Sequence, residues 1–283
     1  MKEVVRAALA EDIGPLGDLT ASLLPAKAGG DAVVVPRTDG VLAGSAAAHE
    51  AFAQVDTRIA VAWTATDGDR VRAGDAVARV VGPLASILTA ERTALNFLAH
   101  LSGIATLTRR YVDLADGRVA IRDTRKTTPG LRSLEKAAVR AGGGVNHRAN
   151  LSDGILVKDN HLAGVSIAAA VATARRLWPG RTVQVECDDA GQLGQALAAG
   201  ADLVLLDNMT PAQVRDCVDL VASEAAQSGR QRCLVEVSGG VTLATLDAYA
   251  GTGADLVAIG ALTHSAPILD IGLDIVVIPA GAG

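Results

Sequence analysis

The hydrophobic pattern of the chain changes character near residue 118. Beyond that point, short apolar runs alternate with longer segments whose apolar residues recur at helical spacing. Short apolar strands that alternate with helices are typical of a parallel sheet covered on both faces. The predicted strands are 119–121, 155–157, 183–185, 203–206, 234–237 and 256–259, and the predicted connecting helices are 166–178, 189–199, 211–226 and 242–250.

Each of these predicted strands ends in polar residues or glycine; for example, Lys158, Glu186 and Asp207 each close one apolar run. In an α/β barrel the active site lies at the C-terminal ends of the strands. An open, doubly wound sheet would also bind ligands at strand ends. The regular spacing favours a barrel with somewhat fewer than eight strands.

The part of the chain before residue 107 mixes helical and β-rich segments. The apolar spacing predicts a long helix over 83–107, with Ser86 as its N-cap. The tail 267–275 is predicted to leave the barrel and return to this N-terminal part. The other predicted elements are helices 4–12 and 46–54 and strands 32–35, 41–43, 59–63 and 76–80.

Composition removes several classes of function. The 283 residues are 2% aromatic and carry a net charge of −5, which argues against nucleic acid binding, because that requires broad positive surface and stacking platforms. Three cysteines without a Cys-x-x-Cys pair fit a reduced cytoplasmic protein and exclude a zinc ribbon or disulfide scaffold. We expect no signal peptide and no membrane span, because no long apolar run occurs.

Positive charge is concentrated between residues 122 and 161, although the whole chain is acidic. Such a concentration is typical of a binding site for a small anion; the alternative is a solvated, charge-rich loop. Glycine and proline at 129–130 and 142–144 favour the binding site, because they fix turns and let backbone approach a ligand. The cations are Arg122, Arg125, Lys126, Arg132, Lys136, Arg140, Arg148 and Lys158.

The strand ends offer three kinds of chemistry. Arginine forks suit carboxylates. The carboxylates Glu186 and Asp207 suit Mg²⁺ that is bound to substrate phosphates. The glycines at 239–240 and at 260 suit a phosphate.

Each feature has a simpler explanation, such as a helix cap for a lone acid or a structural role for His147. Walker, dinucleotide-binding and nucleophile-elbow motifs are absent from the sequence.

Longer motifs closely resemble the quinolinate phosphoribosyltransferase family. They include Asp-Thr-Arg-Lys-Thr-Thr-Pro-Gly-Leu-Arg at 123–132, Gly-Gly-Gly-Val-Asn-His-Arg at 142–148, Lys-Asp-Asn-His at 158–161 and Glu-Arg-Thr-Ala-Leu-Asn at 91–96. The resemblance extends from 11–14 to 269–271, nearly the whole chain. One departure is Gln184, where the family commonly has glutamate, while Glu186 keeps the second glutamate of that motif.

The resemblance implies an α/β fold with two domains: an N-terminal α/β sandwich (1–105, joined by the tail 270–283) and an incomplete α/β barrel of about seven strands (106–269). It implies transfer of phosphoribose from phosphoribosyl pyrophosphate to quinolinate with decarboxylation, in NAD biosynthesis, with Mg²⁺ as the cofactor. It also implies a cytoplasmic homodimer, or a larger assembly of such dimers, in which each subunit completes its partner's site.

The resemblance also implies a role for individual residues. Arg92 would reach the partner's site and hold a quinolinate carboxylate. The other quinolinate contacts would be Arg125, His147, Arg148 and Lys158. The phosphoribosyl pyrophosphate contacts would be Lys126, Glu186 and Asp207, the last two meeting Mg²⁺ through substrate or water, and Thr124 would be a further substrate contact. The 5′-phosphate would lie on Ser238, Gly239, Gly240, Gly260 and His264. The catalytic residues would be Lys126, Lys158, Glu186 and Asp207.

Two alternatives remain open at this stage. A related enzyme on the same scaffold could act on another ring acid, such as nicotinate, or serve molybdate metabolism. A carrier or binding module could instead be built on the 67–75 hairpin, which resembles lipoyl and biotinyl carriers. That hairpin contains no lysine for covalent attachment, which argues against a carrier.

Overall fold

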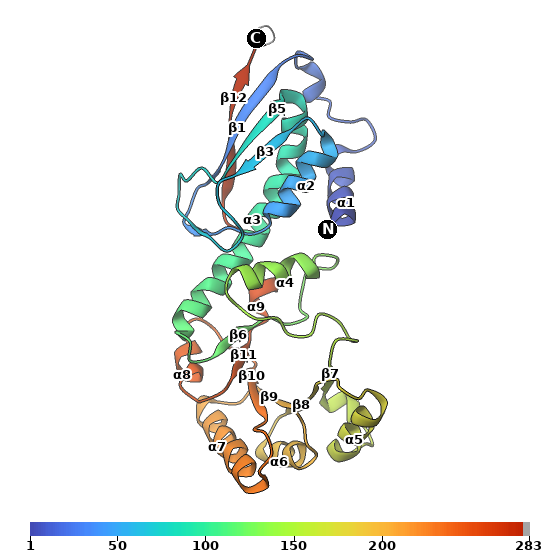
Figure 1. Cartoon of the computed structure of the whole chain (residues 1–283), viewed down its shortest axis with the longest axis vertical. Helices are drawn as coiled ribbons and strands as arrows, with labels where there is room; N and C mark the ends of the chain where they lie inside the picture. Colours follow the sequence, from blue (N-terminus) through green and yellow to red (C-terminus); the bar gives the residue numbers. More distant parts are fainter. Residues whose placement is uncertain (280–283) are drawn as a thin grey trace. The chain divides into compact units, whose positions relative to one another are not determined.

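The structure, a computed structural model, describes residues 1–279 (Figure 1). The chain divides into two compact units. The first contains Met1–Arg109, Thr127–Gly143 and the described part of Leu262–Gly283; the second contains Arg110–Lys126 and Gly144–Ala261. Residues 280–283 of the predicted tail lie outside the described residues. Within residues 1–279, none of the helices combines the length and apolar character that a membrane span requires.

The first unit is built on a four-stranded antiparallel sheet with the order β12-β1-β5-β3. β12, which follows every strand of the second unit in the chain, pairs with β1 from Gly29↔Ile278 to Pro36↔Ile271. The strands are β1 (Gly29–Pro36), β3 (Ala60–Trp63), β5 (Ala78–Pro83) and β12 (Ile271–Ile278), with a separate pair β2 (Gly40–Val41) and β4 (Arg70–Val71). The helices are α1 (Lys2–Ile13), η1 (Ala21–Leu23), α2 (Ser45–Val55), α3 (Leu84–Ala115, which continues into the second unit), α4 (Arg132–Ala141) and α9 (Ala261–His264).

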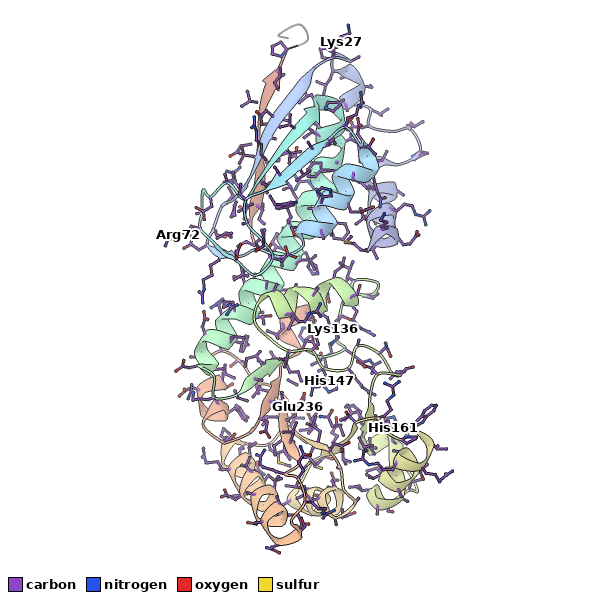
Figure 2. The ribbon with its side chains drawn as sticks, viewed as in Figure 1. Lys27, Arg72, Lys136, His147, His161 and Glu236 are labelled. Carbon is purple, nitrogen blue, oxygen red and sulfur yellow. The ribbon has the colours of Figure 1, made fainter. Side chains whose placement is uncertain are left out.

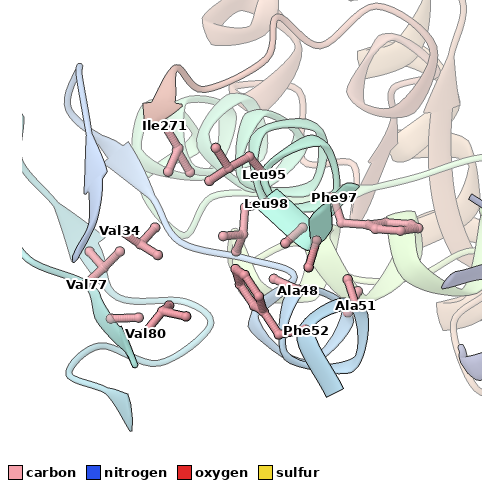
Figure 3. Close-up of a cluster of buried hydrophobic side chains, with 14 of the residues drawn as sticks. Val34, Ala48, Ala51, Phe52, Val77, Val80, Leu95, Phe97, Leu98 and Ile271 are labelled. Carbon is pink, nitrogen blue, oxygen red and sulfur yellow. The ribbon is translucent and has the colours of Figure 1, made fainter. Parts of the chain in front are cut away.

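Apolar side chains from the sheet, α2 and α3 form the core of the first unit (Figure 3). Phe52 and Leu98 are 1% and 0% exposed. Ala48 and Ala51 are buried on the same helix as Phe52, so α2 presents small side chains to its neighbours. Val34 and Val80 contribute from β1 and β5.

The predicted N-cap of the long helix is wrong. α3 begins at Leu84, directly after β5 ends at Pro83. Ser86 therefore lies inside the first turn of the helix, and its hydroxyl donates a hydrogen bond to Asp56 Oδ2 at 2.7 Å. The strand leads into the helix without a loop, so there is no extended residue at position 86 that could act as a cap.

The second unit contains a six-stranded parallel sheet with the order β6-β11-β10-β9-β8-β7 (Figure 1). All six predicted strands are confirmed: β6 (Ala120–Arg122), β7 (Ile155–Val157), β8 (Val183–Cys187), β9 (Leu203–Asp207), β10 (Leu234–Ser238) and β11 (Leu256–Ala258). The helices are η2 (Asp159–His161), α5 (Ile167–Leu177), α6 (Ala190–Ala198), α7 (Pro211–Ser228) and α8 (Leu246–Ala250). Ser166, Asp189 and Thr210 cap α5, α6 and α7, each accepting a backbone N–H with its side chain.

Side chains from alternate strands meet inside this sheet. Arg122 of β6 and Gln184 of β8 both donate hydrogen bonds to Glu236 of β10, at 2.9 and 2.6 Å. Neither β6 nor β8 is adjacent to β10. Interior layers built from alternate strands are a property of curved, barrel-like sheets. Because β6 and β7 are the two edges of the sheet, the barrel is incomplete, as predicted.

Candidate active site

The strand registers determine which side chains face the inside of the curved sheet. Residues paired in neighbouring parallel strands point to the same face. Glu186 pairs with Leu205, Leu205 with Glu236, and Asp207 with Ser238. Since every second residue points the same way, the last polar residue of each of these strands points inward.

These inward residues line a cavity of about 400 Å³ in the second unit. The strands and the loops that follow them supply its lining. The lining residues are Thr124, Arg125, Lys126, His147, Arg148, Leu156, Lys158, Glu186, Leu205, Asp207, Ser238 and Ala258. The cavity thus brings together nine residues that the sequence singled out, from segments up to 114 residues apart (Thr124 to Ser238).

Five predicted site residues are not among the lining. Arg92 lies exposed on α3, and His264 ends α9; both belong to the first unit. His264 Nδ1 lies 2.6 Å from the hydroxyl of Ser265. Gly239, Gly240 and Gly260 follow β10 and β11 in the second unit.

Two guanidinium groups give one wall of the cavity its positive charge. Burial lowers the pKa of Arg148, and the nearby charge of Arg125 lowers it further. Arg148 Nη1 donates a hydrogen bond to the carbonyl of Gly154 at 3.0 Å. Two like charges at one wall repel each other, and a bound anion would relieve that repulsion. The wall is therefore suited to a carboxylate.

Two carboxylates lie on neighbouring strands of the same cavity. Glu186 of β8 forms an ion pair with the ammonium group of Lys158, which follows β7. Asp207 ends β9, and its Oδ2 accepts a hydrogen bond from the side chain of Asn208 at 2.6 Å. The cavity therefore also carries negative charge, and Lys158 partly neutralises the charge of Glu186.

The turn after β10 packs tightly against the turn after β9. Asn208 donates its backbone N–H to the carbonyl of Ser238 at 2.9 Å. Gly239 has a φ of 99°, and a Cβ there would lie 2.2 Å from Asn208 Oδ1. Glycine is required here by both the backbone conformation and the lack of space. The turn thereby fixes Ser238 beside Asp207.

The basic stretch 122–161 does not act as one group. Arg132, Lys136 and Arg140 lie on α4 in the first unit, and Lys136 is only 3% exposed. The run 142–144 also departs from expectation. A Cβ at Gly142 would lie 2.5 Å from the carbonyl of Ala105, so this glycine allows close packing against α3 rather than approach to a ligand.

A buried polar layer beneath the cavity was not predicted from the sequence. Asp123 is fully buried; its Oδ1 accepts the backbone N–H of His147 at 2.8 Å, and its Oδ2 accepts the Asn146 amide. Glu236 is also fully buried, and burial raises the pKa of its carboxyl. A charged residue inside the apolar run 234–237 was the available signal. The face of the sheet to which Glu236 points could not be inferred without the strand register.

The carboxylates of the cavity suit Mg²⁺ only if a bound ligand supplies further oxygen atoms to the ion. Residues 1–279 contain no group of three or more His, Cys, Asp or Glu side chains placed to hold a metal. Mg²⁺ usually takes one or two protein carboxylates and completes its shell with phosphate oxygens and water. Glu186 and Asp207, on neighbouring strands of an open cavity, match that arrangement.

Comparison with known families identifies both parts of the chain. Residues 18–102 match the model described as quinolinate phosphoribosyl transferase, N-terminal domain, and residues 104–274 match the C-terminal domain of the same family.

Individual relatives match over almost the whole chain. The chain is 43% identical to the nicotinate-nucleotide pyrophosphorylase (carboxylating) of Mycobacterium leprae, covering 97% of this chain and 96% of the relative. It is 38% identical to the decarboxylating quinolinate phosphoribosyltransferase 2b of Nicotiana tabacum, covering 97% and 82%. The solved structure of the nicotinate-nucleotide pyrophosphorylase from Francisella tularensis superposes with a TM-score of 0.90 at 38% identity, covering 97% and 95%.

Proposed function

The chain belongs to the quinolinate phosphoribosyltransferase family, and we propose that it converts quinolinate and phosphoribosyl pyrophosphate into nicotinate mononucleotide, pyrophosphate and CO₂ in NAD biosynthesis. The observation that carries this proposal is the composition of the cavity. Two arginines approach each other on one wall, and two carboxylates lie on neighbouring strands. An acid and a magnesium-bound sugar phosphate need these two surfaces.

Arg125 and Arg148 bind the dicarboxylate. Each guanidinium offers a planar fork that matches a carboxylate. A ligand with two carboxylates would offset the repulsion that Arg125 exerts on Arg148. Lys158 adds a third cation. Its ammonium group pairs with Glu186, and in this proposal it pairs with a carboxylate of the acid when the acid binds. His147 and Thr124 complete this side of the site.

Lys126, Glu186 and Asp207 face the sugar phosphate. Mg²⁺, when bound, supplies positive charge that stabilises the leaving pyrophosphate. Lys126 is exposed at the cavity and adds a second positive charge for that group. Glu186 and Asp207 stabilise the positive charge that develops at the anomeric carbon as the bond to pyrophosphate breaks. Ser238, Gly239, Gly240, Gly260 and His264 hold the 5′-phosphate in this proposal.

The chain's own residues then position the bound acid for two bond changes. The ring nitrogen forms a bond to the anomeric carbon while pyrophosphate leaves with the electron pair. The ring becomes cationic and accepts the electrons released when the neighbouring carboxylate leaves as CO₂; a proton then adds at that carbon. Exclusion of water around this carboxylate favours its loss. Lys158, which lines the cavity, and water are the two candidate donors of this proton.

The reaction is tested directly with the purified protein. Incubation with quinolinate, phosphoribosyl pyrophosphate and Mg²⁺ should yield nicotinate mononucleotide and CO₂ in equal amounts, and removal of Mg²⁺ with a chelator should abolish turnover. Turnover of nicotinate in place of quinolinate, without CO₂, would favour the related-enzyme alternative. A mass shift from covalent attachment at residues 67–75 would favour a carrier.

The proposal includes a cytoplasmic homodimer, alone or in a larger assembly, in which Arg92 serves the partner's site. Arg92 is exposed on its own helix, which supports a role outside its own subunit. Arg92→Ala and Lys126→Ala should each be nearly inactive. Mixing equal amounts should restore roughly a quarter of wild-type activity, because half of the dimers are then mixed and each has one intact site. No recovery on mixing would contradict the shared site.

A further inference from the structure

A fully buried carboxyl group, that of Glu236, lies on β10 in the interior of the parallel sheet (Figure 2). Arg122 Nη1 and Gln184 Nε2 both donate to Glu236 Oε2, at 2.9 and 2.6 Å. The other oxygen, Oε1, is buried and has no hydrogen-bond partner among residues 1–279. A carboxylate in such a place is costly, and a packed apolar side chain would be at least as stable. Stability alone therefore does not explain it.

His147 connects this carboxylate to the cavity. Its Nε2 lies 3.8 Å from the same oxygen, Glu236 Oε2. Its Nδ1 accepts the backbone N–H of Arg148 at 2.7 Å. A neutral imidazole whose Nδ1 accepts a hydrogen bond carries its proton on Nε2. The N–H of His147 thus faces Glu236 Oε2, and the other ring nitrogen accepts the backbone N–H of Arg148.

We propose that Glu236 is a positioning residue for acid binding: it holds His147 in the tautomer with the proton on Nε2, and through that ring it fixes Arg148 at the cavity wall. Asp123 fixes the same segment from its backbone side, by accepting the His147 N–H at 2.8 Å. Arg122 and Gln184 hold the carboxyl group in place through their hydrogen bonds to Oε2. The proposal deepens the proposed function, on which it rests for the identity of the acid.

The test compares two buried glutamates. Glu236→Gln removes the charge and keeps the size. Glu135→Gln is the matched control, because Glu135 is also fully buried and also pairs with a histidine (His100, 2.8 Å), but it lies in the first unit and does not line the cavity. Affinities for quinolinate and for phosphoribosyl pyrophosphate are measured by calorimetry on the whole chain, with unfolding midpoints recorded for each variant.

We expect Glu236→Gln to weaken quinolinate binding about tenfold and to leave phosphoribosyl pyrophosphate binding within about twofold, where tenfold corresponds to 1.4 kcal/mol. Glu135→Gln should lower the unfolding midpoint without changing quinolinate affinity. Equal losses for both ligands in Glu236→Gln, or an equal loss of quinolinate affinity in both variants, would overturn the proposal.

A spectroscopic measurement tests the tautomer without any ligand. The chain has five histidines, so the imidazole ¹⁵N signals of His147 can be assigned with a His147→Gln variant. The wild type should show a protonated Nε2 and an unprotonated Nδ1, and Glu236→Gln should lose this single-tautomer pattern. Unchanged signals would overturn the proposal. If the wild type shows the pattern but does not bind quinolinate, the proposed function fails and the positioning role stands.

A second variant covers the case in which Glu236→Gln does not fold. Gln184→Leu removes one hydrogen bond to Glu236 and leaves the carboxyl group itself unchanged. It should weaken quinolinate binding about threefold, in the same direction as Glu236→Gln. Unchanged quinolinate affinity in a folded Gln184→Leu protein would overturn the proposal.

Discussion

The antiparallel sheet of the first unit and the parallel sheet of the second are both made of short apolar strands, but their covered faces hold different residues. In the first unit, Val34 and Val80 meet other hydrophobic side chains. In the second unit, the inward face carries the hydrogen-bonded side chains of Arg122, Gln184 and Glu236. The first sheet provides stability through burial of apolar surface. The second accepts buried charge where a ligand has to be held, so changes in the two sheets should be separable by experiment.

Truncation in the apolar core should have the largest effect. Phe52→Ala should lower the free energy of unfolding by about 3–5 kcal/mol, because it removes a fully buried ring and leaves a cavity. Urea unfolding measures this loss, and the folded fraction should still bind quinolinate normally. Leu23→Ala, at a side chain that is 82% exposed, is the control and should stay within about 0.5 kcal/mol of wild type.

Loss of a cavity carboxylate should affect rate and not stability. Asp207→Asn should lower kcat by about 10²–10³ and leave quinolinate binding nearly intact, because an electrostatic contact of the transition state is lost. Glu186→Gln should lower kcat similarly but also alter quinolinate binding, since it releases Lys158. Asp188→Asn, at an exposed residue next to β8, is the control. An Asp207→Asn enzyme with normal kcat would contradict the assignment.

Loss of either arginine of the cationic wall should affect the dicarboxylate most. Arg125→Ala and Arg148→Ala should each weaken quinolinate binding by roughly 1.5–3 kcal/mol, and nicotinate binding by less, because nicotinate has one carboxylate fewer. Titration calorimetry with both acids measures the difference. Arg140→Ala changes a cation of the same basic stretch on α4 and should leave both affinities unchanged. Equal losses for the two acids would show that these arginines do not distinguish them.

The smallest effect should come from an ion pair of the second unit, Arg175–Asp202, neither of whose residues lines the cavity. Burial would raise the pKa of Asp202, but hydrogen bonds from Arg175 and from the backbone of Val183 lower it below its usual value. This stabilisation is present above the unfolded pKa of about 3.9 and is lost as the pH falls through the lower, folded value.

Asp202→Asn should therefore cost about 0.5–1 kcal/mol at pH 7, and less as the pH falls below 4. Unfolding midpoints at several pH values measure this dependence. The exposed Asp219→Asn variant is the control. A loss for Asp202→Asn that does not change with pH would show that the charge of Asp202 is not the cause.

The strands of the second unit could be predicted because each is a short apolar run closed by a polar residue. The predicted boundaries of the helices were less accurate. α8 begins at Leu246, four residues after the predicted start, because Thr242 and Thr245 form a hydrogen-bonded turn ahead of it. Ser86 failed as a cap because β5 runs directly into α3.

The cavity could be predicted residue by residue where a motif ends a strand, as at Glu186 and Asp207. The layer below it could not. Whether Glu236 points to the helices or to the interior depends on its register with Leu205, and its contacts with Arg122 and Gln184 depend on the curvature of the sheet. Neither property belongs to a single segment of the chain.

The pairing of β1 with β12 has a consequence for synthesis of the chain. On the edge of β1 that pairs with β12, Gly29 has no partner until Ile278 has been synthesised. The whole of the second unit is translated between these two residues. Until then, β1 exposes an unpaired edge that can join other chains. The second unit is translated as Arg110–Lys126 and Gly144–Ala261, interrupted by Thr127–Gly143, and is complete before β12 is made, so it can form first. A nascent chain stopped before residue 271 should therefore be protease-sensitive in the first unit and should depend on chaperones.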